Sequence, residues 1–262
     1  MEDIRFNSLV NFVNVFGNAK VLGSGKEGTC YKKGSKTYKL YKPMYYNLYN
    51  NEVAIKRLLK FRNLLIDNIY FIRSLIYVGD DMIGSVSNYA SGMNCGKVQL
   101  HKRNLDKLIL SLSILKKNIY ELSELGIYIE DEFLPNMLYD GNTFKLIDTG
   151  GYYYSSEILD CEVFDCEDKD DVLVIYRKNM KKIMKLLFQN ITNIDTKNDD
   201  FIFAFLWYVD SPYKTYLIDT DLMINPDETI IGIRDTIEEC VGHRIENFSS
   251  CRNELLKIRK RR

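Results

Sequence analysis

The sequence predicts an α+β protein in which short strands come first and helices dominate afterwards. Two observations support this prediction. Residues 19–42 and 69–90 contain short strand-like runs separated by turn residues. Residues 104–125 and 172–191, in contrast, carry apolar side chains at helical spacing.

The first 90 residues are predicted to follow the order β-β-β-α-β-β. Residues 1–18 form a short amphipathic lead, and Gly34-Ser35 suits a tight hairpin turn between strands. Residues 47–65 switch to helical spacing. Gly79-Asp80-Asp81 then forms the turn between two further strands.

The rest of the chain is predicted to be mainly helical. Residues 104–125 form the clearest helix, and Gly126 is a natural C-terminal stop. Two short strands, NMLYD and TFKLID, follow around the turn at Asp140-Gly141-Asn142. A second helix is expected over 172–191, and the remainder to Arg262 reads as mainly helical.

Composition excludes several classes of protein. The chain has 262 residues and 46% hydrophobic content, which is enough for a sizeable core. Its 36 basic and 36 acidic residues balance, so a globally basic nucleic-acid binder is not expected. No apolar run reaches 18 residues, and the N-terminus lacks signal-peptide features. A cytoplasmic location without a membrane span is therefore predicted, and secretion without a cleaved signal stays open.

The cysteines do not predict a metal or disulfide framework. The six cysteines include no CxxC pair, and the chain has only two histidines. The spacing therefore gives no zinc site. Reduced thiols in a cytosolic setting are the simplest interpretation.

A glycine-rich segment is the first candidate for chemistry. Leu22-Gly23-Ser24-Gly25-Lys26-Glu27-Gly28-Thr29-Cys30 matches GxGxxG. In a dinucleotide-binding unit the third glycine opens a helix, whereas here Gly28 leads into a strand. Such a glycine-rich hairpin lets backbone amides approach phosphates closely. On this segment alone, an ordinary glycine-rich hairpin remains an equal alternative.

Further polar residues follow in a fixed order. Thr37-Tyr38-Lys39 lies on the next strand, and Glu52 lies early in the next helix. Asp131 and Asn136 are five residues apart, and Asp148-Thr149-Gly150 follows the short hairpin. Over residues 20–150 this order resembles the protein-kinase superfamily.

The resemblance implies one two-lobed domain over 1–262. An antiparallel-sheet N-lobe would cover about residues 1–89, and a hinge would lie at about 87–92. A reduced, mainly helical C-lobe would cover about 93–262, with the cleft between the lobes.

The resemblance also implies a site for ATP and Mg²⁺. Lys39 would contact the α- and β-phosphates and be held by Glu52, with Lys42 as a competitor for its role. Replacing Lys39 by Met is expected to abolish transfer with little loss of stability, since a lysine exposed in a cleft packs little. The residues expected around the nucleotide are Gly23, Ser24, Gly25, Gly28, Cys30, Asn88, Tyr89 and Ala90, the last three in the adenine-reading hinge.

The expected catalytic and metal residues lie further along the chain. Asp148 and Asn136 would hold Mg²⁺. Asp131 would orient the acceptor hydroxyl and receive its proton.

The sequence departs from the superfamily pattern at several points. Ile129-Glu130 stands where His-Arg is usual, and Phe133 stands where a cation is usual. A nearby Lys or Arg, or a second metal, is expected to replace that cation. The DFG motif is Asp148-Thr149-Gly150 here, and no convincing APE motif follows.

Three functions fit these residues. The first is an atypical Ser/Thr protein kinase acting on protein substrates. The second is a small-molecule kinase of the same fold, as in aminoglycoside or choline kinases, acting on an alcohol. The third is a pseudokinase that serves as a scaffold.

Two charged segments lie outside the motif pattern. The acidic run at 157–171 is either a solvated loop or a recruiting site for basic substrates. KIRKRR at the end is predicted to be a solvated basic tail.

Overall fold

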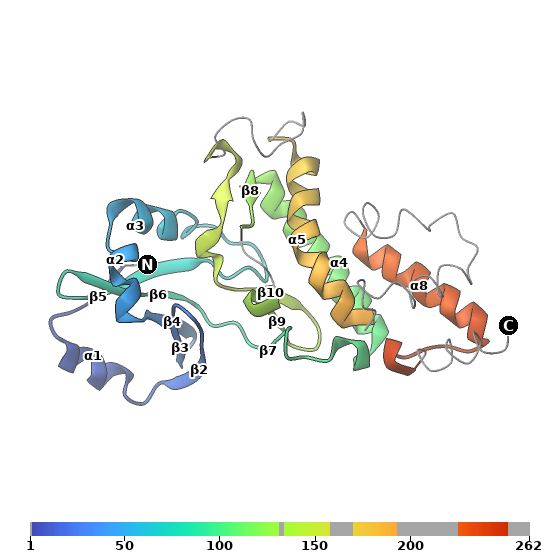
Figure 1. Ribbon diagram of the computed structural model, residues 1–262, viewed down its shortest axis with the longest axis horizontal. Coiled ribbons are helices and arrows are strands. Elements are labelled where there is room, and N and C mark those ends of the chain that lie inside the picture. Colours follow the sequence, from blue (N-terminus) through green and yellow to red (C-terminus); the bar gives the residue numbers. More distant parts are fainter. Residues whose placement is uncertain (1, 131–133, 158–169, 193–224, 251–262) are drawn as a thin grey trace. The chain divides into compact units, whose positions relative to one another are not determined.

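The computed structural model describes residues 2–130, 134–157, 170–192 and 225–250 (Figure 1). The chain is α+β, as the sequence predicts. It divides into two compact units: Met1–Ala90 with Leu146–Tyr152, and Ser91–Lys145 with Tyr153–Arg262. The superfamily resemblance implies that Leu146–Tyr152 is part of the C-lobe, but its contacts group this segment with the first unit.

A six-stranded sheet forms the centre of the first unit, in the order β1-β5-β6-β4-β3-β2. The pairs β2–β3, β3–β4, β4–β6 and β5–β6 are antiparallel, and β3 and β4 are joined through the predicted turn at Gly34-Ser35. The strand bounds are β1 (Ile4–Phe6), β2 (Lys20–Ser24), β3 (Gly28–Lys33), β4 (Lys36–Tyr41), β5 (Ile72–Val78) and β6 (Asp81–Asn88).

The sheet is not purely antiparallel, and here the prediction is wrong. Strand β1 pairs parallel to β5, with Ile4 opposite Ile76. Asp3 strengthens this edge, because its Oδ1 accepts a 2.9 Å hydrogen bond from the Leu75 backbone N–H. A three-residue strand is too short to show an alternating pattern, and its partner lies about 70 residues away.

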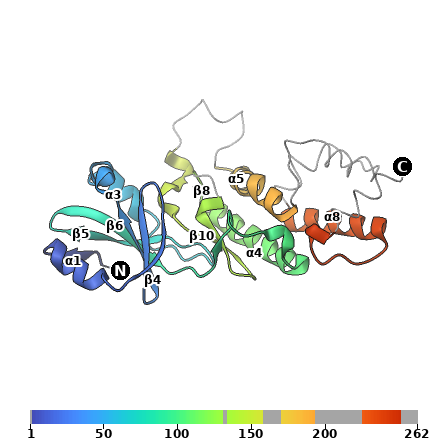
Figure 2. The same cartoon turned by 60° about the horizontal axis from the view of Figure 1, so that its bottom comes forward.

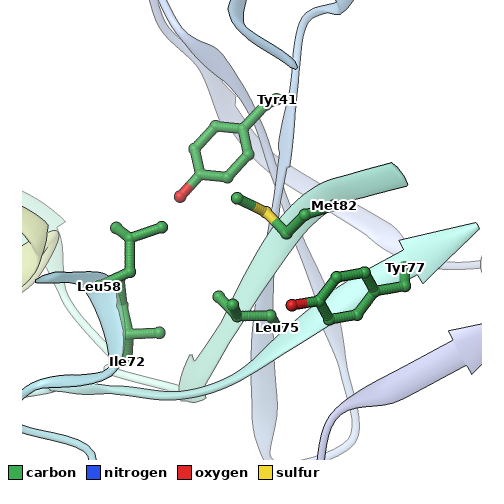
Figure 3. Close-up of a cluster of buried hydrophobic side chains, with 6 residues drawn as sticks. All are labelled: Tyr41, Leu58, Ile72, Leu75, Tyr77 and Met82. Carbon is green, nitrogen blue, oxygen red and sulfur yellow. The ribbon is translucent and has the colours of Figure 1, made fainter. Parts of the chain in front are cut away.

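Helices cover both faces of this sheet. Helix α1 (Leu9–Phe16) places Phe12 and Phe16 in a cluster with Ile76. The adjacent Leu75 belongs to a second cluster, shown in Figure 3. Successive strand residues point to opposite faces, so the two clusters lie on opposite sides of the sheet. The second cluster packs against η1 (Pro43–Tyr45), α2 (Tyr46–Tyr49) and α3 (Glu52–Leu59).

Helix α4 (Leu105–Glu124) organises the second unit and confirms the predicted helix at 104–125. One face of the helix is fully buried, and Gly126 follows the helix with φ +70°. The buried apolar residues of this face are Leu105, Leu108, Leu112, Leu115, Ile119 and Leu122. Helix α4 packs against α5 (Val172–Thr192) and α8 (Pro226–Val241). Figures 1 and 2 both show α4 and α5 side by side.

Short strands complete the second unit, and the second strand of the predicted hairpin leads into Leu146–Tyr152 of the first unit. The predicted hairpin is present as β9 (Met137–Tyr139) and β10 (Phe144–Leu146), with β7 (Met93–Asn94) beside β9. Strand β8 (Ile127–Tyr128) pairs with β11 (Tyr153–Tyr154). The 3-10 turns are η2 (Leu100–Lys102), η3 (Leu134–Asn136), η4 (Thr149–Gly151) and η5 (Ser155–Glu157).

Two predicted features fall largely outside the described residues. These are the acidic run, of which 158–169 is not described, and the basic C-terminal tail. Among the helices that the structure does describe, none is long and apolar enough to cross a membrane.

Candidate functional site

The glycine-rich segment is a tight turn between β2 and β3. The Gly25 N–H donates to the Gly28 carbonyl at 2.8 Å, and Gly28 begins strand β3. Because no helix begins at Gly28, the dinucleotide-binding interpretation of this segment is excluded.

The three glycines of the motif differ in what requires them. A Cβ on Gly28 would lie 2.1 Å from the Leu40 carbonyl oxygen, so packing alone demands glycine there. A Cβ on Gly23 or Gly25 would meet nothing within 4 Å, and neither residue has a left-handed φ. The protein's own packing therefore does not demand glycine at these two positions, where a bare backbone would let a phosphate approach closely.

Strand β4 places Lys39 at the centre of the first unit's polar cluster. Lys39 lies opposite Cys30 of β3 and Ser85 of β6. The side chain is only 17% exposed. Its Nζ donates to both carboxylate oxygens of Asp148, at 2.9 and 2.7 Å, and to Glu27 Oε2 at 2.9 Å.

Backbone pairing brings Asp148 to this cluster. The Leu146 N–H donates to the Asn68 carbonyl at 2.8 Å, and the Tyr70 N–H donates to the Leu146 carbonyl at 2.9 Å. Two residues later Asp148 adopts a left-handed conformation with φ +56°. Such conformations are costly for residues other than glycine and concentrate at functional sites.

Glu52 does not take its predicted place beside Lys39. It occupies the first turn of α3, its side chain is 80% exposed, and it pairs with Lys56 at 2.6 Å. An acidic side chain at a helix start is stabilised locally by the helix dipole and by the i+4 lysine. Glu27 partners Lys39 instead.

Glu27 is not among the residues that the sequence pattern predicts for the site, although it lies within the glycine-rich segment. The available signal was an acidic residue in the turn that faces strand β4. Lys42, the predicted competitor of Lys39, donates to the Gly25 carbonyl at 2.8 Å and so supports this same turn.

The charges in the cluster stabilise one another. Burial works to lower the pKa of Lys39, but the charge of Asp148 and the hydrogen bonds that Lys39 donates to both carboxylates raise it well above its usual value. Burial likewise works to raise the pKa of Glu27, but Lys39 holds it below its ordinary value. Tyr49 hydrogen-bonds Glu27 and stacks on Tyr41 with ring centroids 4.2 Å apart.

The cluster has one more carboxylate than ammonium group, and this excess negative charge suits a metal cation bound to phosphate. Two carboxylates share one ammonium group. Across the described ranges, no three His, Cys, Asp or Glu side chains gather as a ready-made metal site. Mg²⁺ is commonly held by only one or two carboxylates, together with substrate phosphates and water. Asp148 therefore has the donor chemistry that such an ion requires.

The remaining predicted nucleotide residues of the first unit are also described. Ser24 Oγ and Thr29 Oγ1 are 3.0 Å apart across the β2–β3 pair. Cys30 is partly buried, and this burial raises the pKa of its thiol. Asn88 Oδ1 accepts from Lys36 Nζ at 2.6 Å.

The predicted hinge is partly engaged within the protein. The Tyr89 N–H donates to the Ser35 carbonyl at 2.9 Å, and the Tyr89 ring lies under Lys32 Nζ at 3.7 Å. Ala90 is buried. The Tyr89 amide is thus already hydrogen-bonded within the protein.

Asn136 belongs to the second unit. Asn136 ends η3, next to Pro135, whose carbonyl accepts from Asn94 Nδ2 at 2.6 Å. Asp131 and Phe133 lie outside the described residues.

Comparison of the sequence with known protein-family models finds no match, and comparison with curated proteins finds none either.

Proposed function

We propose that the protein is an ATP-dependent phosphotransferase that moves the γ-phosphate of ATP to a hydroxyl group. The preferred candidate is an atypical Ser/Thr protein kinase. One observation carries the proposal. Lys39 and Asp148 are 109 residues apart, yet they meet in a two-point hydrogen-bonded ion pair next to a glycine-rich turn. A polyphosphate with its metal needs these three features together: a fixed cation, a carboxylate and accessible amides.

Lys39 would bind the nucleotide by exchanging partners. In the free protein its ammonium group is neutralised by two carboxylates. Phosphate oxygens present the same acceptor chemistry and would take over some of these hydrogen bonds. Gly23 and Gly25 would let the turn's backbone amides approach the phosphates.

Asp148 would then be free to hold Mg²⁺, with Asn136 as the second metal residue implied by the resemblance. When bound, Mg²⁺ would neutralise phosphate charge. Asp148 is well suited to this, because its backbone is fixed by the Leu146 pairing just before it.

In the transfer step, Asp131 would act as the general base. The acceptor oxygen forms a bond to the γ-phosphorus while the bond from that phosphorus to the β–γ bridging oxygen breaks, and ADP leaves. The hydroxyl proton passes to the Asp131 carboxylate. This role follows from the superfamily resemblance.

The test is to incubate the protein with labelled ATP and Mg²⁺, alone, with a generic basic protein and with small alcohols. Label on protein Ser or Thr supports the first function, and label only on small alcohols supports the small-molecule kinase. Binding of ATP without any transfer favours the scaffold. Absence of Mg²⁺-dependent ATP binding overturns the proposal.

A further inference from the structure

Helix α1 lies at the periphery of the first unit (Figures 1 and 2) and carries apolar side chains on its outer side as well as on the side that packs against the sheet. Phe12 and Phe16 are buried against the sheet, whereas Val10 is 67% and Val13 is 56% exposed. The helix sequence, LVNFVNVF, contains no charged residue. A surface helix ordinarily directs polar and charged side chains outward. Packing within the first unit therefore does not explain the exposed valines.

The apolar surface continues onto the part of the sheet that α1 leaves uncovered. Val21 of β2 is 57% exposed and lies opposite Tyr31 of β3, which lies opposite Tyr38 of β4. Directly opposite residues share a face of the sheet. Tyr38 meets Phe16 edge-to-face with ring centroids 4.8 Å apart, so this is the face on which α1 lies. The edge strand β2 therefore adds an exposed valine on the same face as α1.

Two lysines border this surface at the tip of the β3–β4 hairpin. Lys33 follows Tyr31 by two residues, so it shares the same face, and it lies directly opposite Lys36. Like charges in this arrangement repel each other. Lys33 Nζ donates to the Val15 carbonyl in the last turn of α1, and Lys36 Nζ donates to Asn88 Oδ1, each at 2.6 Å. Both partners are neutral, and within the described residues no carboxylate forms an ion pair with either lysine.

The positive charge is local to this end of the sheet. Lys36 lies opposite Asn88, the last residue of β6, whereas the exposed Asp81 is the first residue of β6. The two ends of this eight-residue strand are about 23 Å apart. A partner that covers the hairpin tip therefore meets lysines beside valines, without nearby carboxylates from that turn.

The chemistry of these residues favours a membrane over a protein or a nucleic acid. Hot spots of protein interfaces are rich in Trp, Tyr and Arg, whereas Lys is depleted and Val is under-represented there. Nucleic-acid phosphates suit the lysines but leave the exposed valines without a role. A bilayer surface suits both, because valine can enter the boundary between headgroups and acyl chains while the lysine ammonium group reaches lipid phosphate.

We propose that the exposed valines and the lysine pair form a docking surface for an anionic lipid membrane. The surface consists of Val10, Val13, Val21, Lys33 and Lys36. Each lysine near such a membrane contributes about fivefold in affinity, and each buried methylene group contributes about three- to fourfold. Lys39 follows Tyr38 along β4 and so lies on the opposite face of the sheet. Membrane binding is therefore separate from the Lys39–Asp148 cluster and does not depend on phosphate transfer.

Co-sedimentation of the full chain with lipid vesicles tests the proposal. Wild type should bind phosphatidylcholine vesicles that contain about one third phosphatidylserine, and bind pure phosphatidylcholine vesicles about 10-fold more weakly or less. Binding to the anionic vesicles should weaken as salt is added, because salt screens exposed charges. Failure to bind the anionic vesicles overturns the proposal, and so does equal binding to both kinds of vesicle.

The double variant Val10→Asn/Val13→Asn tests the apolar part of the surface. Val and Asn have similar helix propensities, so α1 should be retained and the urea midpoint should match wild type. Affinity for anionic vesicles should fall about 10-fold or more. Val53→Asn is the matched control, because Val53 is 77% exposed on α3 at the other face of the sheet, and it should bind like wild type. Unchanged binding by the double variant, or an equal loss in the control, contradicts the proposal.

The double variant Lys33→Gln/Lys36→Gln tests the charged part and leaves the α1 sequence unaltered. Its affinity for anionic vesicles should fall about 25-fold, the product of two fivefold contributions. Lys97→Gln alters an exposed lysine of the second unit and should bind like wild type. Full affinity in the double lysine variant would remove the lipid-phosphate contacts and with them the proposal.

Two other partners give different results. A wild-type dimer in light scattering that Val10→Asn/Val13→Asn dissociates would assign the valines to a second copy of the chain and overturn the proposal. Binding of single-stranded RNA without binding of anionic vesicles would assign the lysines to a nucleic acid, with the same consequence.

Discussion

Lys39 donates a 2.9 Å hydrogen bond to Glu27 in the glycine-rich turn, and Glu27 thereby occupies the partner position that the sequence pattern assigned to Glu52. The ammonium group of Lys39 is thus held from two sides, by the turn and by Asp148. A ligand that binds Lys39 must compete with both carboxylates.

Replacing Glu27 by Gln is expected to tighten Mg·ATP binding, by roughly 3- to 10-fold. The neutral amide competes less well than a carboxylate for the ammonium group of Lys39, since charge-assisted hydrogen bonds are about twice as strong as neutral ones. Titration calorimetry measures the change. Glu52→Gln is the matched control and should bind like wild type, because Glu52 pairs with Lys56 at the surface. Weaker binding in Glu27→Gln would mean that Glu27 holds Lys39 in its ligand-binding position.

Replacing Lys39 by Met is expected to abolish transfer and also to destabilise the first unit. The sequence suggested an exposed lysine of little structural weight, whereas the structure shows a largely buried cation between two carboxylates. Its loss leaves those groups unpaired, at a cost of about 1–3 kcal/mol in the free energy of unfolding. Urea denaturation measures this cost, with the exposed Lys20→Met as control. An unchanged urea midpoint would contradict the ion-pair argument, and wild-type transfer would contradict the role of Lys39.

Replacing Asp148 by Asn separates charge from backbone conformation. Asn tolerates the left-handed φ of +56°, so the fold should be retained. Transfer should fall on the order of 10²–10³-fold, the usual cost of removing one group that stabilises transition-state charge. Asp148→Ala should be less stable than Asp148→Asn, because Ala is strained at this φ. Wild-type transfer by a well-folded Asp148→Asn protein would remove Asp148 from the site.

Two glycine variants distinguish packing from ligand approach. Gly28→Ala should unfold or strongly destabilise the first unit, since the new methyl group would meet the Leu40 carbonyl at 2.1 Å. Gly25→Ala should fold normally and weaken ATP binding, because its methyl group meets only open space. Thermal denaturation and ATP titration of both variants test this. Normal ATP affinity in Gly25→Ala would show that the turn does not approach the phosphates.

The β9–β10 turn predicts an acid-sensitive contribution to stability in the second unit. Burial works to raise the pKa of Asp140, but Lys145, with its Nζ 2.6 Å from Oδ2, and the Asn142 and Thr143 amides lower it to about 2. A lowered pKa stabilises the fold above the ordinary value and loses this effect as the pH falls from about 4 to about 2. Urea unfolding should show wild type more stable than Asp140→Asn at pH 5, with the difference shrinking below pH 4. A pH-independent difference would contradict the assignment.

Local sequence patterns predicted the type and order of most elements. The apolar spacing of 104–125 and 172–191 became α4 and α5, and the hairpin around Asp140 became β9 and β10. These features could be read because side-chain periodicity reports which face of a helix or strand is apolar. The resemblance of the motif order to the protein-kinase superfamily placed Lys39 and Asp148 among the candidate residues, although it could not show that they touch.

Only the tertiary structure determined which distant strands and side chains contact one another. Three contacts join segments far apart in sequence. They are the parallel β1–β5 pair, the Lys39–Asp148 ion pair, and the hydrogen bonds that link Asn179 and Lys182 to Ile129 and Glu130. Periodicity carries no information on such long-range contacts. The exchange of Glu52 for Glu27 has the same origin: a helix start with a lysine four residues later satisfies Glu52 locally, and the β2–β3 turn brings Glu27 to the buried ammonium group of Lys39.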